Sequence, residues 1–255
     1  MDILLQLAFL FFIGSVLGWG IEVFYRRFFS ANNPERRWIN PGFLTGPWLP
    51  LYGFSLCVLY LLAMLEPYIP IANDGLRKAA LFIVMAVCVT GVEYVAGIIF
   101  IKGMHIKLWD YSKQWGNIGG IVCPKFTLYW MLLSAAYYFL VHPTILDDLQ
   151  WLSDNLAFSF FIGLFFGFFL VDFATAVHLA HKIRAFAKEN GIDVRFEELK
   201  STIRASKEQA REKSRFALAM YSKTPLIGQL RAYRDKLHAG PVKSAAHAPK
   251  KAANP

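Results

Sequence analysis

The sequence lacks the short motifs that mark most ATP-driven and hydrolytic enzymes. It contains no G-x-x-x-x-G-K-[ST] and no G-x-S-x-G, which excludes P-loop ATP hydrolysis by this chain and a hydrolase nucleophile elbow. Cysteine is scarce as well. Cys57, Cys88 and Cys123 are scattered without a C-x-x-C pair, so the sequence indicates no disulfide framework and no cysteine metal site. The energy for any uphill process must therefore come from a partner or an ion gradient.

Charge is unevenly distributed in a chain that is apolar overall. Residues are 56% hydrophobic and 16% aromatic, with a mean hydropathy of +0.38, which is typical of an integral membrane protein. The net charge of +9 arises mostly in the tail, because 17 of the 27 Lys and Arg residues follow His181. The N-terminus has no basic n-region and no A-x-A cleavage site, so we expect its apolar run to be a retained span.

Five apolar stretches reach or approach the length of about 20 residues that a membrane helix needs. They are Ile3–Tyr25, Pro47–Leu65, Ala79–Ile101, Val122–Val141 and Leu156–Ala180. We therefore expect an all-α, polytopic membrane domain over residues 1–181. The fourth stretch is the weakest, because Pro124 and Lys125 interrupt its start. A re-entrant segment there, or at Thr45–Pro50, is an open alternative.

Lys and Arg concentrate in alternate loops. The first loop carries Arg26, Arg27, Arg36 and Arg37, and the third carries Lys102, Lys107 and Lys113. The second loop has only Arg77 and Lys78, and the fourth, His142–Asn155, has neither residue type. Because short loops rich in Lys and Arg stay in the cytoplasm, we expect a multi-pass protein of the bacterial inner (plasma) membrane. Its N-terminus lies outside and its C-terminus in the cytoplasm.

The charged segment 182–238 is compatible with helices and is broken at Asn190-Gly191 and at Pro225. Apolar residues recur there at helical spacing: Phe196, Leu199 and Ile203, then Leu226, Leu230, Tyr233 and Leu237. Such basic amphipathic helices pack on the protein or attach to anionic lipid head groups, and the sequence leaves both possibilities open. Residues 239–255, rich in Ala, Lys and Pro, are expected to form a disordered cytoplasmic tail.

The membrane domain is organised around the segment Trp38–Gly53, WINPGFLTGPWLPLYG, which holds three prolines and three glycines. Helices tolerate neither residue well in their interior, so we expect a fixed irregular approach to the second span. A shorter stretch, Gly18-Trp19-Gly20-Ile21-Glu22, places a carboxylate at the opposite end of the same connection. We expect the two stretches to form one structural unit on the cytoplasmic side, the side that residues 102–121 share.

Three carboxylates, Glu22, Glu93 and Asp172, lie inside apolar runs. An acidic residue near the bilayer centre costs a few kcal/mol, so each needs a partner or a polar cavity. Small residues at helical spacing share a face with two of them: Gly14 and Gly18 with Glu22, and Ala86, Thr90 and Gly97 with Glu93. Gly163 and Gly167 form a second G-x-x-x-G pair, roughly opposite Asp172. Such pairs permit close helix approach.

Two explanations of the carboxylates are open. The functional one is a proton or cation site near the cytoplasmic mouth of a pathway. The structural one is that the carboxylates accept hydrogen bonds from the Asn40–Gly46 loop or pair with arginines of the first loop, since a proline-rich loop at membrane depth needs such partners.

Other polar residues give weaker signals. His178 and His181 have no third ligand at a suitable spacing, so we expect no metal site and no cofactor. His105, Trp109, Asp110 and Tyr111 can support acid–base chemistry, although aromatic residues beside a span are commonly interfacial anchors. We do not expect an enzyme, and an intramembrane enzyme using Glu93, His105 and Asp110 is the least favoured alternative.

In combination, these motifs resemble the type IV ABC-transporter membrane proteins, also called the CmpB-like family. The resemblance covers about residues 5–145 and includes Gly18, Trp19, Glu22, Asn40, Gly42, Phe43, Gly46, Pro47, Pro50, Tyr52, Gly53, Glu93, Trp109, Asp110, Tyr111, Asn117 and Gly120, followed by Cys123, Phe126, Trp130 and His142-Pro143. One departure is Pro41, where the family pattern leads us to expect Arg or a similar residue.

The resemblance implies a permease-like membrane subunit that pairs with a separate ATPase subunit. The alternative is a non-transporting scaffold or assembly factor whose loops dock a cytoplasmic or lipid partner. Besides the lipid bilayer, the expected partners include a second copy of the chain, because five spans are few to enclose a pathway. No nucleic acid is expected.

Overall fold

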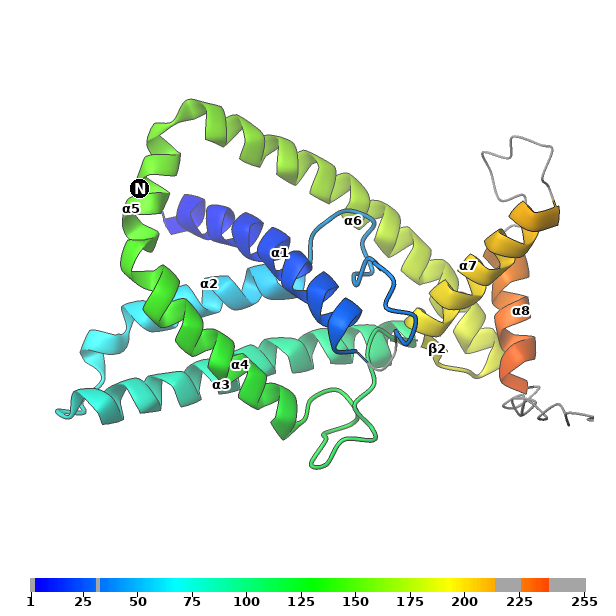
Figure 1. Cartoon of the computed structure of the whole chain (residues 1–255), viewed down its shortest axis with the longest axis horizontal. Coiled ribbons are helices and arrows are strands. Elements are labelled where there is room, and N and C mark those ends of the chain that lie inside the picture. Colours follow the sequence, from blue (N-terminus) through cyan, green and yellow to red (C-terminus); the bar gives the residue numbers. More distant parts are fainter. Residues whose placement is uncertain (1–2, 31–32, 214–225, 239–255) are drawn as a thin grey trace, which may run out of the picture. The chain divides into compact units, whose positions relative to one another are not determined.

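This computed structural model describes residues 3–30, 33–213 and 226–238 and consists mainly of helices. They are α1 (Ile3–Phe28), α2 (Pro50–Met64), α3 (Asp74–Ile98), α4 (Pro124–Ala136), α5 (His142–Asp154), α6 (Leu156–Asn190), α7 (Phe196–Lys213) and α8 (Leu226–His238) (Figure 1). A 3-10 turn spans Glu66–Tyr68, and π-helical turns span Ile99–Gly103 and Tyr137–Val141. The chain divides into two compact units, Met1–Phe196 and Glu197–Pro255.

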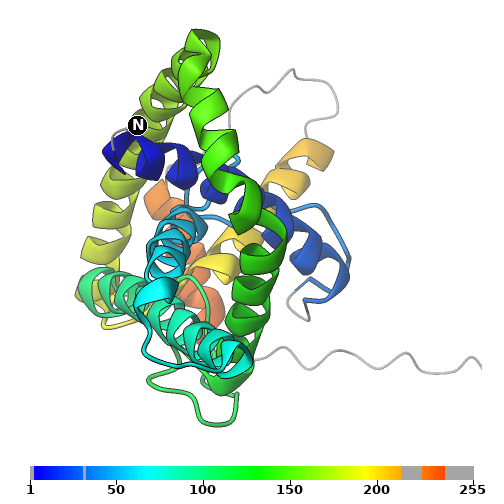
Figure 2. The same cartoon turned by 90° about the vertical axis from the view of Figure 1, so that its left-hand side faces the viewer.

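Within the first unit, successive long helices run in opposite directions (Figure 1). Helices α1, α3 and α6 share one direction, while α2 and α4 run the other way. Figure 2 shows α2 between α1 and α3, and it packs on both. The C-terminal ends of α1 and α3 therefore meet the N-terminal ends of α2 and α4. We call this end of the unit the loop end, because residues 38–49 and 104–123 lie there.

Hydrogen bonds at the opposite end match this arrangement. The Tyr60 hydroxyl near the end of α2 donates to Gln6 Oε1 near the start of α1, over 2.9 Å. The Glu66 carboxylate accepts from the Tyr138 hydroxyl and lies 3.4 Å from Arg77 Nε at the start of α3. These contacts fix the helices to one another at the end opposite the loop end.

Three helical stretches are long and apolar enough to cross a membrane: Ile3–Phe28, Asp74–Gly103 and Phe158–Asn190. The apolar helix α2 has 15 residues, fewer than the expected stretch 47–65, because the helix begins only at Pro50. We expected Pro124 to interrupt the fourth stretch, but Pro124 instead opens α4, a position where the missing proline N–H costs nothing. The π-helical turn then joins α4 to α5.

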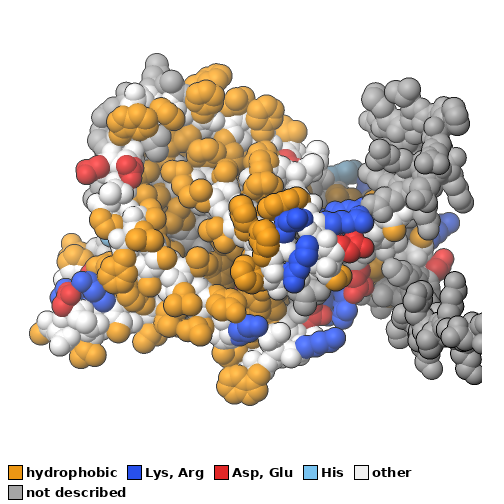
Figure 3. All heavy atoms as spheres, viewed as in Figure 1, with side chains coloured by type: hydrophobic (Ala, Val, Ile, Leu, Met, Phe, Trp, Pro, Cys, Tyr) orange, Lys and Arg blue, Asp and Glu red, His pale blue; other side chains and the backbone are white. Residues whose placement is uncertain are grey.

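The outer surface of the helices carries many large apolar side chains (Figure 3). Leu4, Leu17, Phe160 and Leu140 are between 61% and 76% exposed, values that a water-facing surface cannot sustain over so wide an area. Inside, Phe9, Tyr60, Met85, Leu149 and Ile162 belong to one buried apolar cluster to which α1, α2, α3, α5 and α6 contribute. Contact with the apolar interior of a membrane accounts for the exposed apolar side chains.

Helices α1 and α2 approach closely through glycines. A Cβ atom on Gly18 would lie 2.2 Å from the Tyr52 side chain, and one on Gly53 would lie 2.3 Å from Ser15 Oγ. The Leu49 N–H donates to the Ser15 carbonyl across this contact, at 2.9 Å. The second G-x-x-x-G pair behaves differently, since a Cβ on Gly163 or Gly167 would meet nothing within 4 Å. Among the described residues, no other helix lies close to Gly163 or Gly167.

The all-α expectation omitted two short parallel strands, β1 (Ile106–Lys107) and β2 (Val194–Arg195). Strand β2 follows the break at Gly191, whose φ of 62° lets it end α6. Within the second unit, Leu199, Leu230 and Tyr233 are buried, and the Tyr233 hydroxyl donates to Glu198 at 3.3 Å. The predicted break at Pro225 and the predicted disordered tail, 239–255, lie outside the described residues.

Candidate functional site

Asp172 of α6 holds the proline-rich loop in place. Its Oδ1 accepts from the Thr45 N–H at 3.0 Å, and its Oδ2 accepts from the Gly46 N–H and from Trp48 Nε1, both at 2.9 Å. We call this group the Asp172 clamp. All of its donors are neutral and two belong to the backbone, so the carboxylate supplies the acceptors that an irregular loop cannot find within itself.

Asn40 organises the other half of the loop. Its amide Nδ2 donates to the Leu44 and Thr45 carbonyls at 3.1 and 2.9 Å. Its Oδ1 accepts from the Gly42 N–H at 3.2 Å and from Trp19 Nε1 of α1 at 3.0 Å. The loop is therefore tied to α1 through Asn40 and to α6 through Asp172. Pro41 is buried beside Asn40, a position where the charged residue of the family pattern would need a partner.

Glu22 of α1 connects the first two helices. One of its oxygens accepts from Arg26 Nε at 2.9 Å, one turn further along α1. The other accepts from the Tyr52 hydroxyl of α2 at 3.1 Å. The Tyr52 ring in turn contacts the ring of Trp130 on α4, with centroids 5.2 Å apart. Glu22 thus reaches the fourth helix through one aromatic contact.

Glu93 of α3 is the most buried of the three carboxylates, with 3% of its surface exposed. It accepts from the Tyr111 hydroxyl at 3.1 Å and from Trp130 Nε1 at 2.9 Å. Burial and the neighbouring Glu93 carboxylate raise the pKa of Tyr111 well above its usual value, so the hydroxyl stays protonated and donates. We call Glu22, Tyr52, Trp130, Glu93 and Tyr111 the Glu93 network.

The segment 109–122 folds around its own polar groups. Trp109 Nε1 donates to the Ile121 carbonyl at 2.7 Å, and the Tyr111 N–H donates to the Gly120 carbonyl at 2.8 Å. Asn117 Oδ1 accepts from the Gly120 N–H at 3.0 Å. Gly120 has a φ of 70°, which side chains other than glycine rarely adopt. The turn thereby presents Tyr111 to Glu93.

A polar clasp joins this loop to the chain after α6. Asp193 lies 3.2 Å from His105 Nδ1 and 3.9 Å from Lys107 Nζ, and Arg195 lies 3.4 Å from Asp110. Partial burial acts to raise the pKa of Asp110, but hydrogen bonds from Ser112 and the charges of Lys107 and Arg195 outweigh it and lower that pKa. The acid–base candidates of this loop are therefore divided: His105 and Asp110 belong to the clasp, and Tyr111 to the Glu93 network.

The remaining candidates have packing positions. The Phe43 ring contacts Phe100 and Phe196, with centroids 5.6 and 4.7 Å apart. Pro50 occupies the first turn of α2, and Pro47 separates two donors of the Asp172 clamp. Sequence analysis missed the role of Trp48 and did not include Trp130 among the candidate site residues. The signal for both was an indole N–H at membrane depth, which needs an acceptor.

The arrangement is one of anchored loops. Each carboxylate ties a segment of the loop end to a membrane helix or ties two helices together, and each has at least two donors. The described residues hold no group of three His, Cys, Asp or Glu side chains that could bind a metal ion. Chemically, the site can fix loop geometry and can carry movement between the loops and the helices.

Comparison with known proteins identifies the family. Searches of curated proteins and of solved structures find no match. The family model described as "Putative ABC-transporter type IV" matches residues 9–177, which include the Asp172 clamp and the Glu93 network. This segment is more than half of the chain and confirms the resemblance read from the sequence motifs. The chain therefore belongs to the family that this model describes.

Proposed function

We propose that this protein is a permease-like membrane subunit of an ABC-type transport system and that a separate ATPase subunit docks on its loop end. Family membership carries the proposal. The sequence has no P-loop, so an ATPase partner would supply the energy. In this proposal the chain itself catalyses no reaction.

The anchored loops support this role. A permease subunit must pass movement of its ATPase to membrane helices, and an ordinary surface loop would absorb that movement. Here the Asp172 clamp connects the 38–49 loop to α6, and the Glu93 network connects the 104–123 loop to α3 and α4. Together, the two loops are therefore linked to three helices, α3, α4 and α6.

We place the loop end in the cytoplasm of a bacterial cell, with five passes of the membrane and the N-terminus outside. The three long apolar helices, the shorter helix α2 and the α4 segment supply these passes. The alternation of helix directions and the Lys and Arg distribution support this topology. Self-association of the chain would then help to enclose a pathway.

Cysteine labelling tests this topology. In a variant whose three native cysteines are replaced by serine, we expect Glu35→Cys and Lys113→Cys to resist an impermeant thiol reagent added to intact cells, whereas Asp148→Cys reacts. All three native side chains are exposed, so accessibility reports the side of the membrane. All three should react in permeabilised cells. Reaction of the first two, but not of Asp148→Cys, in intact cells would invert the topology.

Co-purification tests the function. Tagged protein extracted from its own membranes in mild detergent should retain a protein with a P-loop, and the complex should hydrolyse ATP. A P-loop mutation in the partner, Lys→Ala, should abolish that hydrolysis. Stable recovery of the chain without any ATP-binding protein, from membranes in which it is functional, would contradict the proposal.

A second candidate is a non-transporting scaffold that uses the same loop end to dock a different partner. The observation that favours it is that the carboxylates are occupied by hydrogen bonds within the protein, as a static platform requires. The purification separates the two candidates, because a scaffold would retain a partner that lacks ATP-binding motifs.

A further inference from the structure

An apolar groove of about 430 Å³ runs between α3 and α4 and reaches the loop end. Its walls include Ile83, Val87 and Thr90 of α3, Leu128 and Met131 of α4, and Gly116 of the loop. The volume is within the range in which proteins bind a single small molecule. The only polar side chains in the wall that could bond a ligand strongly are Thr90 and Thr127, and these bond each other at 3.1 Å. The groove therefore suits a hydrocarbon chain.

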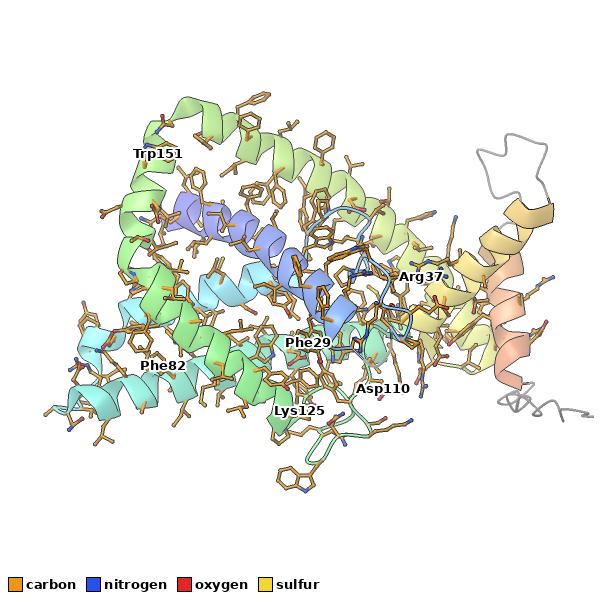
Figure 4. All side chains as sticks on the ribbon, in the orientation of Figure 1. Phe29, Arg37, Phe82, Asp110, Lys125 and Trp151 are labelled. Carbon is orange, nitrogen blue, oxygen red and sulfur yellow. The ribbon has the colours of Figure 1, made fainter. Side chains whose placement is uncertain are left out.

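Two lysines border in sequence the residues that line the loop-end mouth of the groove. Gly116 and Pro124 line the groove there, and the exposed Lys125 directly follows Pro124 at the start of α4, where Figure 4 labels it. Lys113, also exposed, precedes Gly116 by three residues. The only acidic residue of the loop, Asp110, pairs with Arg195 instead. Two exposed lysines therefore lie within three residues of groove-lining positions. The Lys125 Nζ atom lies 5.9 Å from the centroid of the Phe126 ring, and among the described residues no carboxylate forms an ion pair with either lysine.

The same loop carries apolar side chains that are unusual for a water-facing turn. Trp115 is 86% exposed and Ile118 is 59% exposed. Tryptophan is enriched where head groups meet hydrocarbon, so this turn has the chemistry of a membrane interface. This end of the unit thus combines lysines, an interfacial tryptophan and an apolar groove, which match the phosphate, glycerol and acyl chain of a phospholipid.

We propose that this groove binds one anionic phospholipid of the cytoplasmic leaflet, with an acyl chain between α3 and α4 and the phosphate at Lys113 and Lys125. The charge at the mouth is what selects this occupant over an apolar helix of a second copy, which would bring no anion. Anionic lipids are attracted to basic residues at this depth. The proposal depends on membrane insertion with the loop end in the cytoplasm, and it does not depend on transport.

Native mass spectrometry of the purified full chain, with equimolar phosphatidylglycerol and phosphatidylcholine, tests the proposal. We expect one phosphatidylglycerol to be retained per chain in preference to phosphatidylcholine. Val87→Trp should fill the groove and lower retention of both lipids at least tenfold. Val95→Trp is the matched control, because Val95 is an exposed valine of the same helix that does not line the groove. Equal retention of phosphatidylglycerol by the two variants would overturn the groove assignment.

A second pair of variants tests whether the two lysines bind the phosphate. Lys113→Gln with Lys125→Gln should reduce the preference for phosphatidylglycerol by about 30-fold, the factor expected for two lysines near an anionic surface. Lys102→Gln with Lys188→Gln removes the same charge elsewhere and should leave the preference unchanged. An equal loss in both pairs would overturn the site, because it would show nonspecific attraction. A change from dimer to monomer in Val87→Trp with unchanged lipid retention would also overturn it, because a second copy would then cover the groove.

Discussion

Gly18→Leu is expected to destabilise the membrane domain strongly, whereas Gly163→Leu is expected not to destabilise it. Both glycines belong to G-x-x-x-G pairs in apolar helices, but only Gly18 faces a neighbour. A Cβ there would lie 2.2 Å from Tyr52, while one on Gly163 would meet nothing within 4 Å. Tyr52 cannot move aside without breaking its hydrogen bond to Glu22. Overpacking of this kind costs roughly 1–3 kcal/mol or more.

Melting temperatures and yields of monodisperse protein in detergent measure the difference. Gly163→Leu also improves helix propensity by about 1 kcal/mol, so its melting temperature should equal or exceed that of the wild type. Gly167→Leu should behave in the same way. If Gly18→Leu melted at the wild-type temperature, the close contact of α1 with α2 would be wrong. Loss of a dimer in Gly163→Leu alone would show that α6 packs against a second copy.

Glu93→Ala is expected to destabilise the protein strongly and Glu93→Gln only modestly. Alanine leaves the Tyr111 hydroxyl and Trp130 Nε1 without an acceptor in a buried site, at a cost of roughly 1–3 kcal/mol for each group. Glutamine keeps the shape and one acceptor oxygen. Asp148→Ala, which removes an exposed carboxylate, is the control and should have little effect on the melting temperature.

The same variants separate a structural carboxylate from an ion-binding one. If Glu93 only accepts hydrogen bonds, ATP hydrolysis by the proposed complex with an ATPase should follow the amount of folded protein in every variant. A well-folded Glu93→Gln protein without activity, partly rescued by Glu93→Asp, would instead identify Glu93 as a proton or cation site.

Sequence patterns were sufficient to predict a helical membrane protein and to identify the carboxylates that need hydrogen-bond or ion-pair partners. Apolar runs identified the three long helices, and the cost of intramembrane charge singled out Glu22, Glu93 and Asp172. The structural explanation named the Asn40–Gly46 loop and nearby arginines as partners. The Asp172 clamp and the Glu22–Arg26 pair match it. Glu93 differs, since its donors are Tyr111 and Trp130.

The differences have physical causes. Tyr111 and Trp130 lie 18 and 37 residues from Glu93. The periodicity of α3 alone cannot identify a hydrogen-bond donor in a distant segment of the chain. The G-x-x-x-G pattern predicted close approach for both glycine pairs, but a glycine face is used only where another helix lies against it. A proline disrupts the interior of a helix but is well suited to its first turn. Whether Pro124 interrupts the fourth apolar stretch therefore depends on where α4 begins.

The strands β1 and β2 were also beyond the reach of sequence patterns. Each has two residues, too short for an alternating pattern. They are held together because the His105 carbonyl accepts from the Val194 N–H at 2.9 Å. Across the pair, Asp193 lies 3.9 Å from Lys107 Nζ and Arg195 lies 3.4 Å from Asp110. This is a long-range contact between segments separated by the whole of α4, α5 and α6.

Site-specific photocrosslinking tests the central claim, the docking of an ATPase on the loop end, most directly. A benzophenone amino acid at position 113 on the loop end, and in a separate variant at position 148 on the opposite side, is introduced in the full chain and irradiated in native membranes. We predict a crosslink from position 113 to a protein with a P-loop and none from position 148. Crosslinks from position 113 only to proteins without ATP-binding motifs, or a crosslink to an ATPase from position 148 alone, would contradict it.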